Sequence, residues 1–176
     1  TFCAIARDER SNNWKPAGSL RITARPSSDK RPESIMQLVD TYDSLPRPLA
    51  GAVVVLGNFD GVHLGHAGVI QAARQMADEM TTKVVVLTFE PHPRSVFAPH
   101  LPPFRLTPKA AKARFLAELG VAGCVAQKFD SEFSEHSAED FVRNVLIRGL
   151  QVRHLVVGAD FRFGKGREGD VSYLQS

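Results

Sequence analysis

From residue 51 onward, short apolar runs alternate with segments in which apolar side chains recur at helical spacing. The runs over residues 52–56 and 83–89 are continuous and rich in valine, which is typical of strands buried on both faces of a parallel sheet. Shorter runs of the same kind span residues 121–126 and 154–158. We interpret these two runs as a third and a fourth strand.

The segments between the runs show the pattern of amphipathic helices, with apolar residues three and four positions apart. Thr107 followed by Pro108 is a typical helix start, with threonine as N-cap and proline at the first helical position. Ser137 with Asp140 resembles a capping box. The pattern predicts three helices, over residues 65–80, 107–120 and 137–149.

Strands and helices that alternate in this way predict an α/β fold with a parallel sheet and right-handed crossovers. Ligands of such sheets bind beyond the carboxyl ends of the strands, where the connecting loops converge. We therefore expect a binding site to be formed by three loops, over residues 57–66, 90–104 and 159–170.

Residues 1–50 differ from the rest of the chain, because they hold five of the eleven prolines and show no sustained periodicity. We expect a mostly irregular leader, and we place the start of the domain at residue 36. The first residues lack a basic stretch followed by an apolar segment, which is the pattern of a secretory signal, so we predict no such signal. A transit peptide is an alternative for this Arg/Ser-rich leader, although four acidic residues count against it: Asp8, Glu9, Asp29 and Glu33.

Composition narrows the class of protein further. The chain has 176 residues, 43% of them hydrophobic and 23% charged, as expected for one soluble globular domain. The 22 basic residues barely exceed the 19 acidic ones, so we expect no nucleic-acid partner. No apolar run approaches the roughly 18 residues of a membrane helix, so we expect no membrane partner. Cys3 and Cys124 are too far apart for a paired motif, which favours a reducing, cytoplasmic location.

The first of the three loops carries the strongest chemical signal, and it reads Gly57-Asn-Phe-Asp-Gly-Val-His-Leu-Gly-His66. Its glycines allow a ligand to approach the backbone, and the following helix offers unpaired N–H groups to a phosphate. His63 and His66 lie three positions apart, so both rings can donate hydrogen bonds to phosphoryl oxygens at the helix start. The alternative is a glycine-rich turn with incidental surface histidines.

Other phosphate and metal motifs do not fit. The segment Gly158 to Lys165 has five residues between its glycines, and a glycine instead of serine or threonine follows the lysine, which excludes a Walker A loop. The dinucleotide fingerprint is absent from the first turn, and no zinc-protease pattern occurs. We therefore predict no metal site formed by the protein alone.

Three motifs together carry a family resemblance. The segment 57–66, then Thr88-Phe-Glu-Pro-His-Pro-Arg94, and then the segment 157–170 resemble the prokaryotic FAD synthetase, the FMN adenylyltransferase module of the bifunctional riboflavin kinase/FAD synthetase. The resemblance runs from about residue 36 to residue 170 and includes Arg105 to Pro108 with Lys112. It implies the Rossmann-like parallel sheet of the nucleotidylyltransferase superfamily.

The resemblance also implies a reaction, in which AMP passes from ATP to FMN, with Mg²⁺ present, to give FAD and pyrophosphate. FMN and ATP are then the small-molecule substrates, FAD is the product, and the FMN phosphate attacks directly without a covalent enzyme intermediate. Carried over residue by residue, His63 and His66 are the catalytic positions. The other ATP positions are Gly57, Asn58, Phe59, Asp60, Gly65 and Arg167. The flavin positions are Phe89, His92, Pro93, Phe97, Asp160 and Phe161.

Some of the implied flavin residues also have a structural interpretation. Phe161 and Phe163 alternate as core residues of a strand would, so core and ligand roles stay open for both. Phe97 lies in a proline-rich loop, which favours a ligand role. We expect Cys124 to be inert packing within a strand.

Two features of the family are missing from this sequence. The I-S-S-T-x-x-R motif and the riboflavin kinase domain do not occur before the chain ends at Ser176. We therefore expect residues 36–176 to form a partial FMN adenylyltransferase domain whose sheet is incomplete at the C-terminus. A non-catalytic flavin- or nucleotide-binding remnant stays open as the alternative, and the oligomeric state is not predicted.

Overall fold

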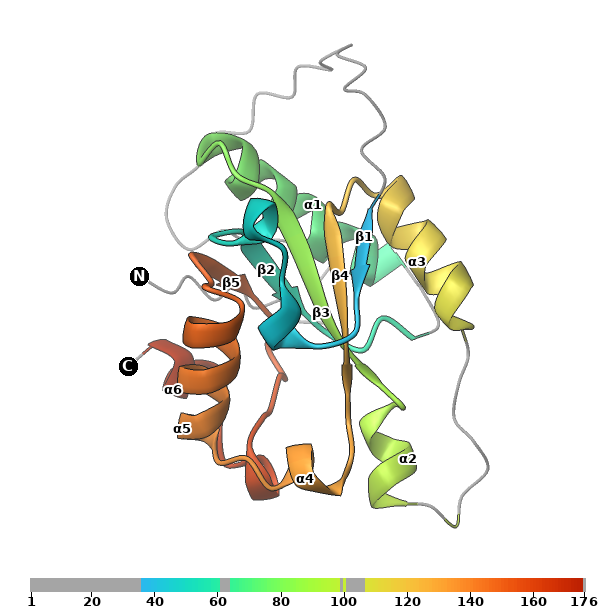
Figure 1. The fold of residues 1–176 in the computed structure, drawn as a ribbon, viewed down its shortest axis with the longest axis vertical. Helices are drawn as coiled ribbons and strands as arrows, with labels where there is room; N and C mark the ends of the chain where they lie inside the picture. Colours follow the sequence, from blue (N-terminus) through green and yellow to red (C-terminus); the bar gives the residue numbers. More distant parts are fainter. Residues whose placement is uncertain (1–35, 61–63, 99, 101–106, 176) are drawn as a thin grey trace.

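A parallel sheet of five strands forms the centre of the molecule, with the strand order β1-β4-β3-β2-β5 (Figure 1). The computed structural model describes residues 36–60, 64–98, 100 and 107–175. All the paired strands run parallel, as the sequence predicts. The strands are β1 (Gln37–Val39), β2 (Val53–Leu56), β3 (Val84–Glu90), β4 (Gly123–Lys128) and β5 (His154–Val156).

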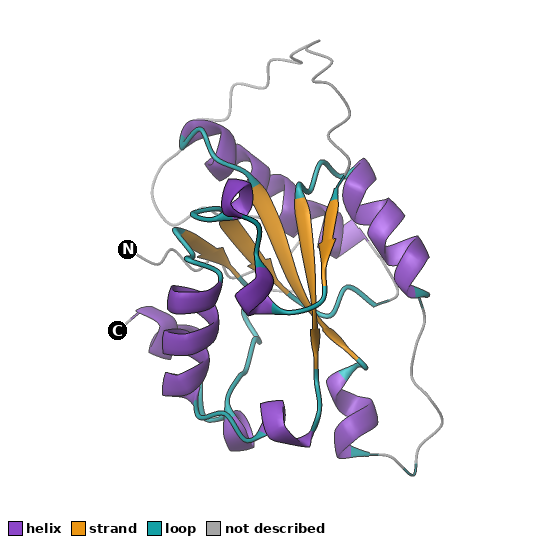
Figure 2. Cartoon of the chain, viewed as in Figure 1, coloured by secondary structure: helices purple, strands orange, loops and turns teal. Residues whose placement is uncertain are grey.

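Helices cover both faces of this sheet (Figure 2). The α-helices are α1 (Leu64–Glu79), α2 (Pro93–Phe97), α3 (Lys109–Glu118), α4 (Ser131–Ser134), α5 (Ala138–Asp140) and α6 (Val171–Gln175). A π-helical stretch, η3 (Phe141–Gly149), continues α5. Short 3₁₀ turns are η1 (Tyr42–Ser44), η2 (Arg47–Leu49) and η4 (Lys165–Arg167).

Two hydrophobic clusters, one on each face, hold the layers together. Val53 and Val55 of β2 point to the face covered by α1 and α3, where they pack with residues such as Ile70 and Leu116. Val54 points to the opposite face, which η3 and α6 cover. Successive residues of a strand point to opposite faces, so a strand that is buried on both needs an unbroken apolar run. This explains why the valine-rich runs are strands.

The four predicted strands are confirmed, with shifts of one or two residues at their ends. The largest shift is in β4, which begins at Gly123 and continues through the polar Gln127 to Lys128. Gln127 is nevertheless buried, because its Oε1 accepts a hydrogen bond from the backbone N–H of Tyr42 at 3.1 Å and its amide donates to the carbonyl of Lys128. These hydrogen bonds compensate for burying an amide in the sheet.

The expectation of an irregular leader up to residue 50 is wrong for its last part. Residues 37–39 form β1, an edge strand that pairs with β4, and Gln37 lies opposite Gly123. Leu49 of η2 is only 1% exposed and packs so closely over Gly123 that a Cβ there would lie 2.5 Å from it. Residues 1–35, the remainder of the predicted leader, lie outside the described residues.

The helix starts were predicted with mixed success. The capping box at Ser137 and Asp140 is confirmed. The predicted N-cap at Thr107 is wrong, because Pro108 has extended backbone angles and is itself the N-cap, so α3 begins at Lys109. The described helices include none long and apolar enough to cross a membrane.

Candidate active site

The carboxyl ends of β2, β3, β4 and β5 lie at one edge of the sheet, at the lower side of Figure 1, and their loops gather there. Parallel strands always present their carboxyl ends together, and this edge is where ligands of such sheets bind. Most of the predicted site residues lie on these loops or on the helices that follow them. The exceptions are Phe89, which lies within β3, and His63, which falls outside the described residues.

The loop after β2, residues 57–60, is shaped by Phe59. Its φ of 49° lies in the left-handed region, and its ring is 2% exposed. The ring folds back over Gly57, where a Cβ would meet it at 3.1 Å, so a side chain at position 57 would press on the ring. The ring of Phe59 also packs against His66, and the two ring centroids lie 5.0 Å apart. Phe59 thus links the loop to the first turn of α1.

His66 is the third residue of α1, and Gly65 is the second. The first N–H groups of a helix have no partner within the helix and carry the positive end of its dipole. An imidazole at this position can add a hydrogen-bond donor to those backbone groups. The arrangement suits an anionic ligand whose charge rises during a reaction.

The same loop is held from the side of α3. The backbone N–H of Thr107 donates a hydrogen bond of 2.8 Å to Oδ1 of Asp60. This contact ties the residue before the N-cap of α3 to the loop after β2. Asp60 is partly buried as a result.

A buried lysine makes the second contact between α3 and the loop, and sequence reasoning assigned it no role. The side chain of Lys112 is 7% exposed, and its Nζ donates to the carbonyl of Asn58 at 2.9 Å. It also lies 3.0 Å from Oε1 of Glu90 and 3.4 Å from Oγ1 of Thr88. The one signal in the sequence is spacing, because Lys112 lies four positions before the buried Leu116 and so shares its inward face.

The turn after β3 leads into α2. A cis peptide joins Glu90 to Pro91, and His92 is the N-cap of α2, where its Nδ1 accepts the backbone N–H of Arg94 at 3.1 Å. Pro93 occupies the first helical position. Burial holds the pKa of His92 below its ordinary value of 6.5. A neutral ring is what an accepting Nδ1 requires.

A continuous series of aromatic rings runs from α2 to the loop after β5. Neighbouring rings have centroid distances between 5.3 and 6.4 Å, in the order Phe97, Phe129, Phe133, Phe141, Phe163 and Phe161. Phe89 joins the series through Phe129 at 5.6 Å. Most of these rings form core, and Phe163 is 6% exposed, so the structural interpretation holds for it.

Phe97 and Phe161 differ from the other rings of the series. Phe97 is 67% exposed, and its ring makes an edge contact with Phe129 at a centroid distance of 5.7 Å. Phe161 is partly buried and stacks on Phe163 with an interplanar angle of 17°. An exposed aromatic ring next to buried ones offers a surface on which a flat ligand can stack.

The loop after β5 is anchored on α5 rather than on the phosphate loop. Glu168 accepts the backbone N–H of Ala138 at 2.8 Å, and the N–H of Lys165 donates to the carbonyl of His136 at 2.7 Å. Asp160 and Arg167 are exposed. The backbone N–H of Arg167 donates to the carbonyl of Gly164 within the same loop, at 2.9 Å.

The described residues contain no group of three His, Cys, Asp or Glu side chains arranged to hold a metal ion. Mg²⁺ usually binds through one or two carboxylates together with substrate phosphates. Asp60 is the carboxylate next to the glycine-rich loop, and one of its oxygens is engaged by Thr107. The carboxylate of Asp60 therefore fits a Mg²⁺ ion that a nucleotide brings.

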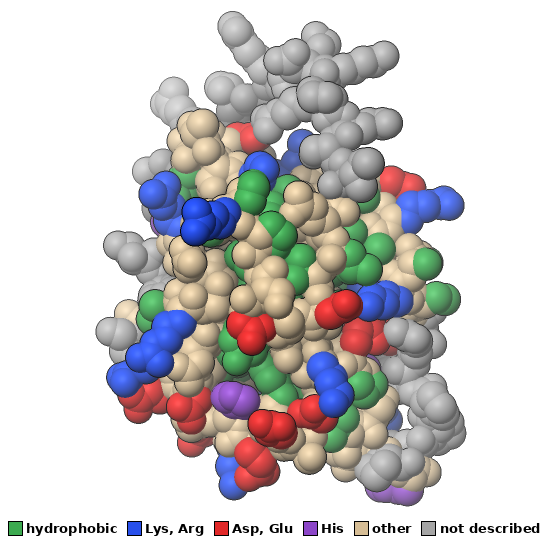
Figure 3. Space-filling view, in the orientation of Figure 1, with side chains coloured by type: hydrophobic (Ala, Val, Ile, Leu, Met, Phe, Trp, Pro, Cys, Tyr) green, Lys and Arg blue, Asp and Glu red, His purple; other side chains and the backbone are tan. Residues whose placement is uncertain are grey.

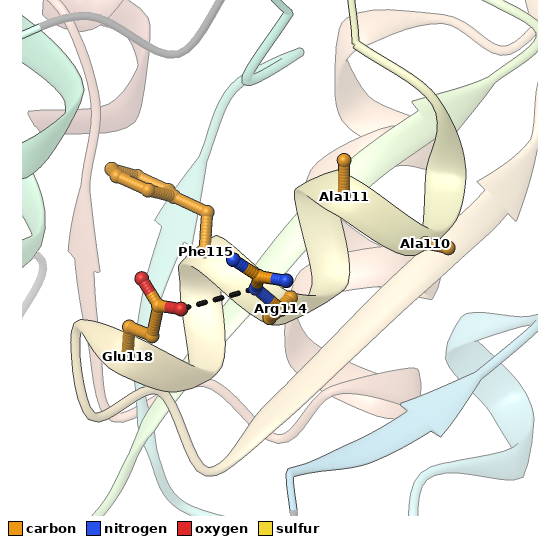
Figure 4. Close-up of a pocket in the computed structure, with 5 residues that line it drawn as sticks. All are labelled: Ala110, Ala111, Arg114, Phe115 and Glu118. Atoms are coloured by element: carbon orange, nitrogen blue, oxygen red, sulfur yellow. Dashed lines mark hydrogen bonds and ion pairs between the residues drawn. The ribbon is translucent and has the colours of Figure 1, made fainter.

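A hollow on the surface of α3 lies apart from this edge. This shallow hollow of about 520 Å³ is lined by Ala110, Ala111, Arg114, Phe115 and Glu118, all on α3, and Arg114 pairs there with Glu118 at 3.2 Å (Figure 4). The hollow includes none of the predicted site residues. Figure 3 shows acidic, basic and apolar side chains interspersed over one face of the molecule.

The parallel sheet, its flanking helices and the glycine-rich loop at the end of β2 define an α/β fold of the nucleotidyltransferase type. The model of the family described as FAD synthetase matches residues 45–176, three quarters of the chain, and the chain belongs to this family.

Similar proteins agree with this family. The chain is 43% identical over 141 residues to a bifunctional riboflavin kinase/FMN adenylyltransferase of Escherichia coli K12, covering 80% of the chain and 45% of that protein. The protein of the same name from Haemophilus influenzae is 39% identical and covers 80% and 46%. The one from Listeria monocytogenes is 43% identical over 123 residues and covers 69% and 39%. The chain thus spans less than half the length of these relatives.

A solved structure shares the fold. The crystal structure of a protein named as a macrolide-efflux protein, from Streptococcus pneumoniae, superimposes with a TM-score of 0.71 at 27% sequence identity. The match covers 80% of this chain and 46% of that one.

Proposed function

We propose that this chain transfers AMP from ATP to FMN and releases FAD and pyrophosphate. The observation that carries the proposal is the loop after β2, which places His66 in the first turn of α1 beneath the ring of Phe59. The names of the relatives, FMN adenylyltransferases, support the same reaction. In this proposal, residues 36–176 act as the adenylyltransferase module.

The reaction needs alignment and charge neutralisation more than it needs a nucleophile from the protein. A phosphate oxygen of FMN attacks the α-phosphorus of ATP, and the bond from that phosphorus to the α,β-bridging oxygen breaks, so that this oxygen leaves with pyrophosphate. Negative charge grows on the leaving group, so hydrogen-bond donors fixed before the reaction stabilise the transition state. In our proposal, His66 and His63 supply such donors together with the backbone N–H groups of α1.

The remaining predicted residues have supporting roles in the proposal. Gly57, Asn58 and Asp60 shape the ATP loop, with Gly65 at the start of α1, and Phe59 acts by packing on His66. Mg²⁺, when bound with ATP, would neutralise phosphate charge, with Asp60 as the nearest carboxylate of the loop. Arg167 is proposed as an ATP contact on the strength of the family motif.

The flavin is proposed to bind at the aromatic end of the site. Phe97 offers an exposed ring on α2, next to His92 and Pro93, and Phe161 lies at the other end of the aromatic series. Isoalloxazine is flat and largely apolar, so stacking on such rings buries it well. Phe89 supports this surface from within the sheet through its contact with Phe129.

A non-catalytic binding module is the alternative, and the comparisons do not favour it, because the relatives are named for the transferase. We also propose a cytoplasmic location, where ATP and FMN are at hand. Formation of FAD from FMN and ATP by the purified chain separates catalysis from binding alone.

The test of the ATP loop is His66→Ala, with His154→Gln as the matched control at the opposite, amino end of β5. Loss of one charge-stabilising donor typically slows the chemical step about 10²- to 10³-fold. We expect that loss for His66→Ala and none for the control, with FMN binding little changed. An unchanged kcat for His66→Ala would overturn the assignment.

The test of the flavin side uses Phe97→Ala and Asp160→Ala, with calorimetric titration of FMN and of ATP. Both variants should weaken FMN binding and leave ATP affinity nearly unchanged, because Phe97 lies on α2 after β3 and Asp160 on the loop after β5, rather than on the loop after β2. A defect confined to ATP would show that the two subsites are exchanged.

A further inference from the structure

Lys112 of α3 is a buried charged side chain that the reaction as described above gives no role. Of the side chains that the structure describes as buried and polar, it is the only charged one, beside Thr88 and Gln127. Removing an ammonium from water is costly unless its donors are satisfied. A lysine in this position therefore needs partners, and those partners indicate its role.

The partners come from the ends of two different strands. The carbonyl of Asn58 belongs to the loop after β2, whereas Thr88 and Glu90 belong to β3. Thr88 also donates its own hydroxyl to the Asn58 carbonyl, at 3.0 Å. The ammonium and the hydroxyl together hold one backbone carbonyl of the loop against the end of the neighbouring strand.

The three acceptors account for the whole donor capacity of the lysine. An ammonium group has three N–H donors, and Nζ of Lys112 lies within hydrogen-bond distance of Asn58, Thr88 and Glu90. No donor is left for a substrate phosphate. Lys112 therefore acts on the reaction through the loop and is not a catalytic residue.

A second contact from the same side strengthens this view. Asp60, two residues after Asn58, accepts the backbone N–H of Thr107, just before α3. The segment 107–112 thus holds the loop at two points, and Phe59 of the same loop packs on His66 of α1. A shift of the loop backbone would therefore move the proposed ATP-binding groups relative to the turn after β3.

We propose that Lys112 is a positioning residue for AMP transfer, which fixes the backbone of the ATP loop to the end of β3 and so sets the spacing between the two substrate sides. The inference rests on the proposed function. A misplacement of about 1 Å between reacting groups can cost about 10²-fold in rate.

The experiment compares Lys112→Met with Lys109→Met. Methionine keeps much of the length of the lysine stem and removes the three donors. Lys109 lies on the same helix and forms an exposed ion pair with Asp40 at 3.1 Å, so its substitution controls for loss of a positive charge on α3. We expect Lys112→Met to lower kcat about 10- to 100-fold, and Lys109→Met to leave kcat and melting temperature unchanged.

A double variant separates positioning from stability. Lys112→Met removes the ion pair with Glu90, which lowers the melting temperature. Adding Glu90→Gln removes the carboxylate charge that Lys112 balances, so Lys112→Met/Glu90→Gln should recover melting temperature while kcat stays low. The single variant Glu90→Gln keeps the contact of Lys112 with Asn58 and should lose less activity than Lys112→Met.

The outcomes are distinct for the two proposals. If kcat of the double variant recovers with its melting temperature, Lys112 is only structural and the inference is overturned. If the wild-type chain forms no FAD, the proposed function fails, and the inference is then decided by calorimetric titration with ATP. Weaker ATP binding by Lys112→Met than by Lys109→Met supports it, and equal or absent binding overturns it.

Discussion

Phe59 is a predicted site residue with a left-handed backbone conformation, as is Arg167. A left-handed φ in a residue with a side chain costs on the order of 1–3 kcal/mol and persists only where surrounding contacts enforce it. Here the enforcing contacts are the burial of its ring over Gly57 and against His66. The strained residue packs on the candidate catalytic His66, so the conformation of Phe59 and the position of that histidine are coupled.

The protonation of His92 offers a direct measurement of the charges around the site. Burial is the largest cause that lowers its pKa, Asp60 and Glu90 raise the pKa, and Lys112 and Arg94 lower it. We expect Lys112→Met to raise the pKa of His92 and Glu90→Gln to lower it, as measured by NMR titration of the imidazole. An unmoved pKa in both variants would contradict the described arrangement of these charges.

The same lowered pKa has a consequence for stability. The unfolded chain binds a proton at His92 near the ordinary pKa of 6.5, whereas the folded chain binds it only at lower pH. Folding is therefore opposed by this group as pH falls below 6.5, and its effect is absent above that value.

Residue roles were predictable from the sequence only where a motif carried them. The segment 57–66 indicated a phosphate loop, and the structure places the described part of it at the carboxyl end of β2. The role of Lys112 was not predictable, because its acceptors at Asn58, Thr88 and Glu90 come from two other elements. Helical spacing indicates that Lys112 faces inward, and only the packed structure shows what it contacts there.

At the scale of elements, the loop after β5 depends on one close approach to α5. Gly164 has a φ of +76°, and a Cβ there would lie 2.6 Å from the backbone nitrogen of Ala138. Gly166 has a similar φ of +64° but nothing within 4 Å. Both glycines avoid the strain of a left-handed residue, and Gly164 alone also avoids a collision with backbone.

We expect Gly164→Ala to destabilise the protein more than Gly166→Ala. Left-handed strain of about 1–2 kcal/mol applies to both variants. The collision adds to it at position 164 and should also push the loop from α5, which weakens FMN binding. Chemical denaturation and FMN titration of the two variants measure these effects. Equal losses of stability and of FMN affinity in both variants would show that the loop can move away from α5 without loss of free energy.

The longer elements were predictable because their apolar patterns are strong. β2 is an unbroken apolar run and β3 is apolar except for Thr88 and Glu90, and the sequence placed their ends within about a residue of the observed ones. β1 was missed because it has three residues and only Val39 is buried, so no periodic pattern can arise. The π-helical form of η3 was missed as well, since its apolar spacing differs little from that of an α-helix.

For the whole molecule, the strand order predicts a gradient of stability. β2 and β3 are flanked by strands on both sides and covered on both faces, whereas β1 is an edge strand with Leu38 48% exposed. Native-state hydrogen exchange should therefore be slowest at Val54 and Val86 and faster at Val39. Equal protection of β1 and β2 would mean that the sheet opens only as one unit.

The position of β1 in the sequence also determines when, during synthesis, this strand can pair. Val53 of β2 and its partner Val84 are 31 residues apart in the sequence, whereas Gln37 of β1 and its partner Gly123 are 86 residues apart. At about 5–20 residues per second, β1 leaves the ribosome about 4–17 s before its partner strand exists. The sheet is thus assembled outward from β2 and β3, and this N-terminal edge strand, translated first, is paired only after β4 has been translated.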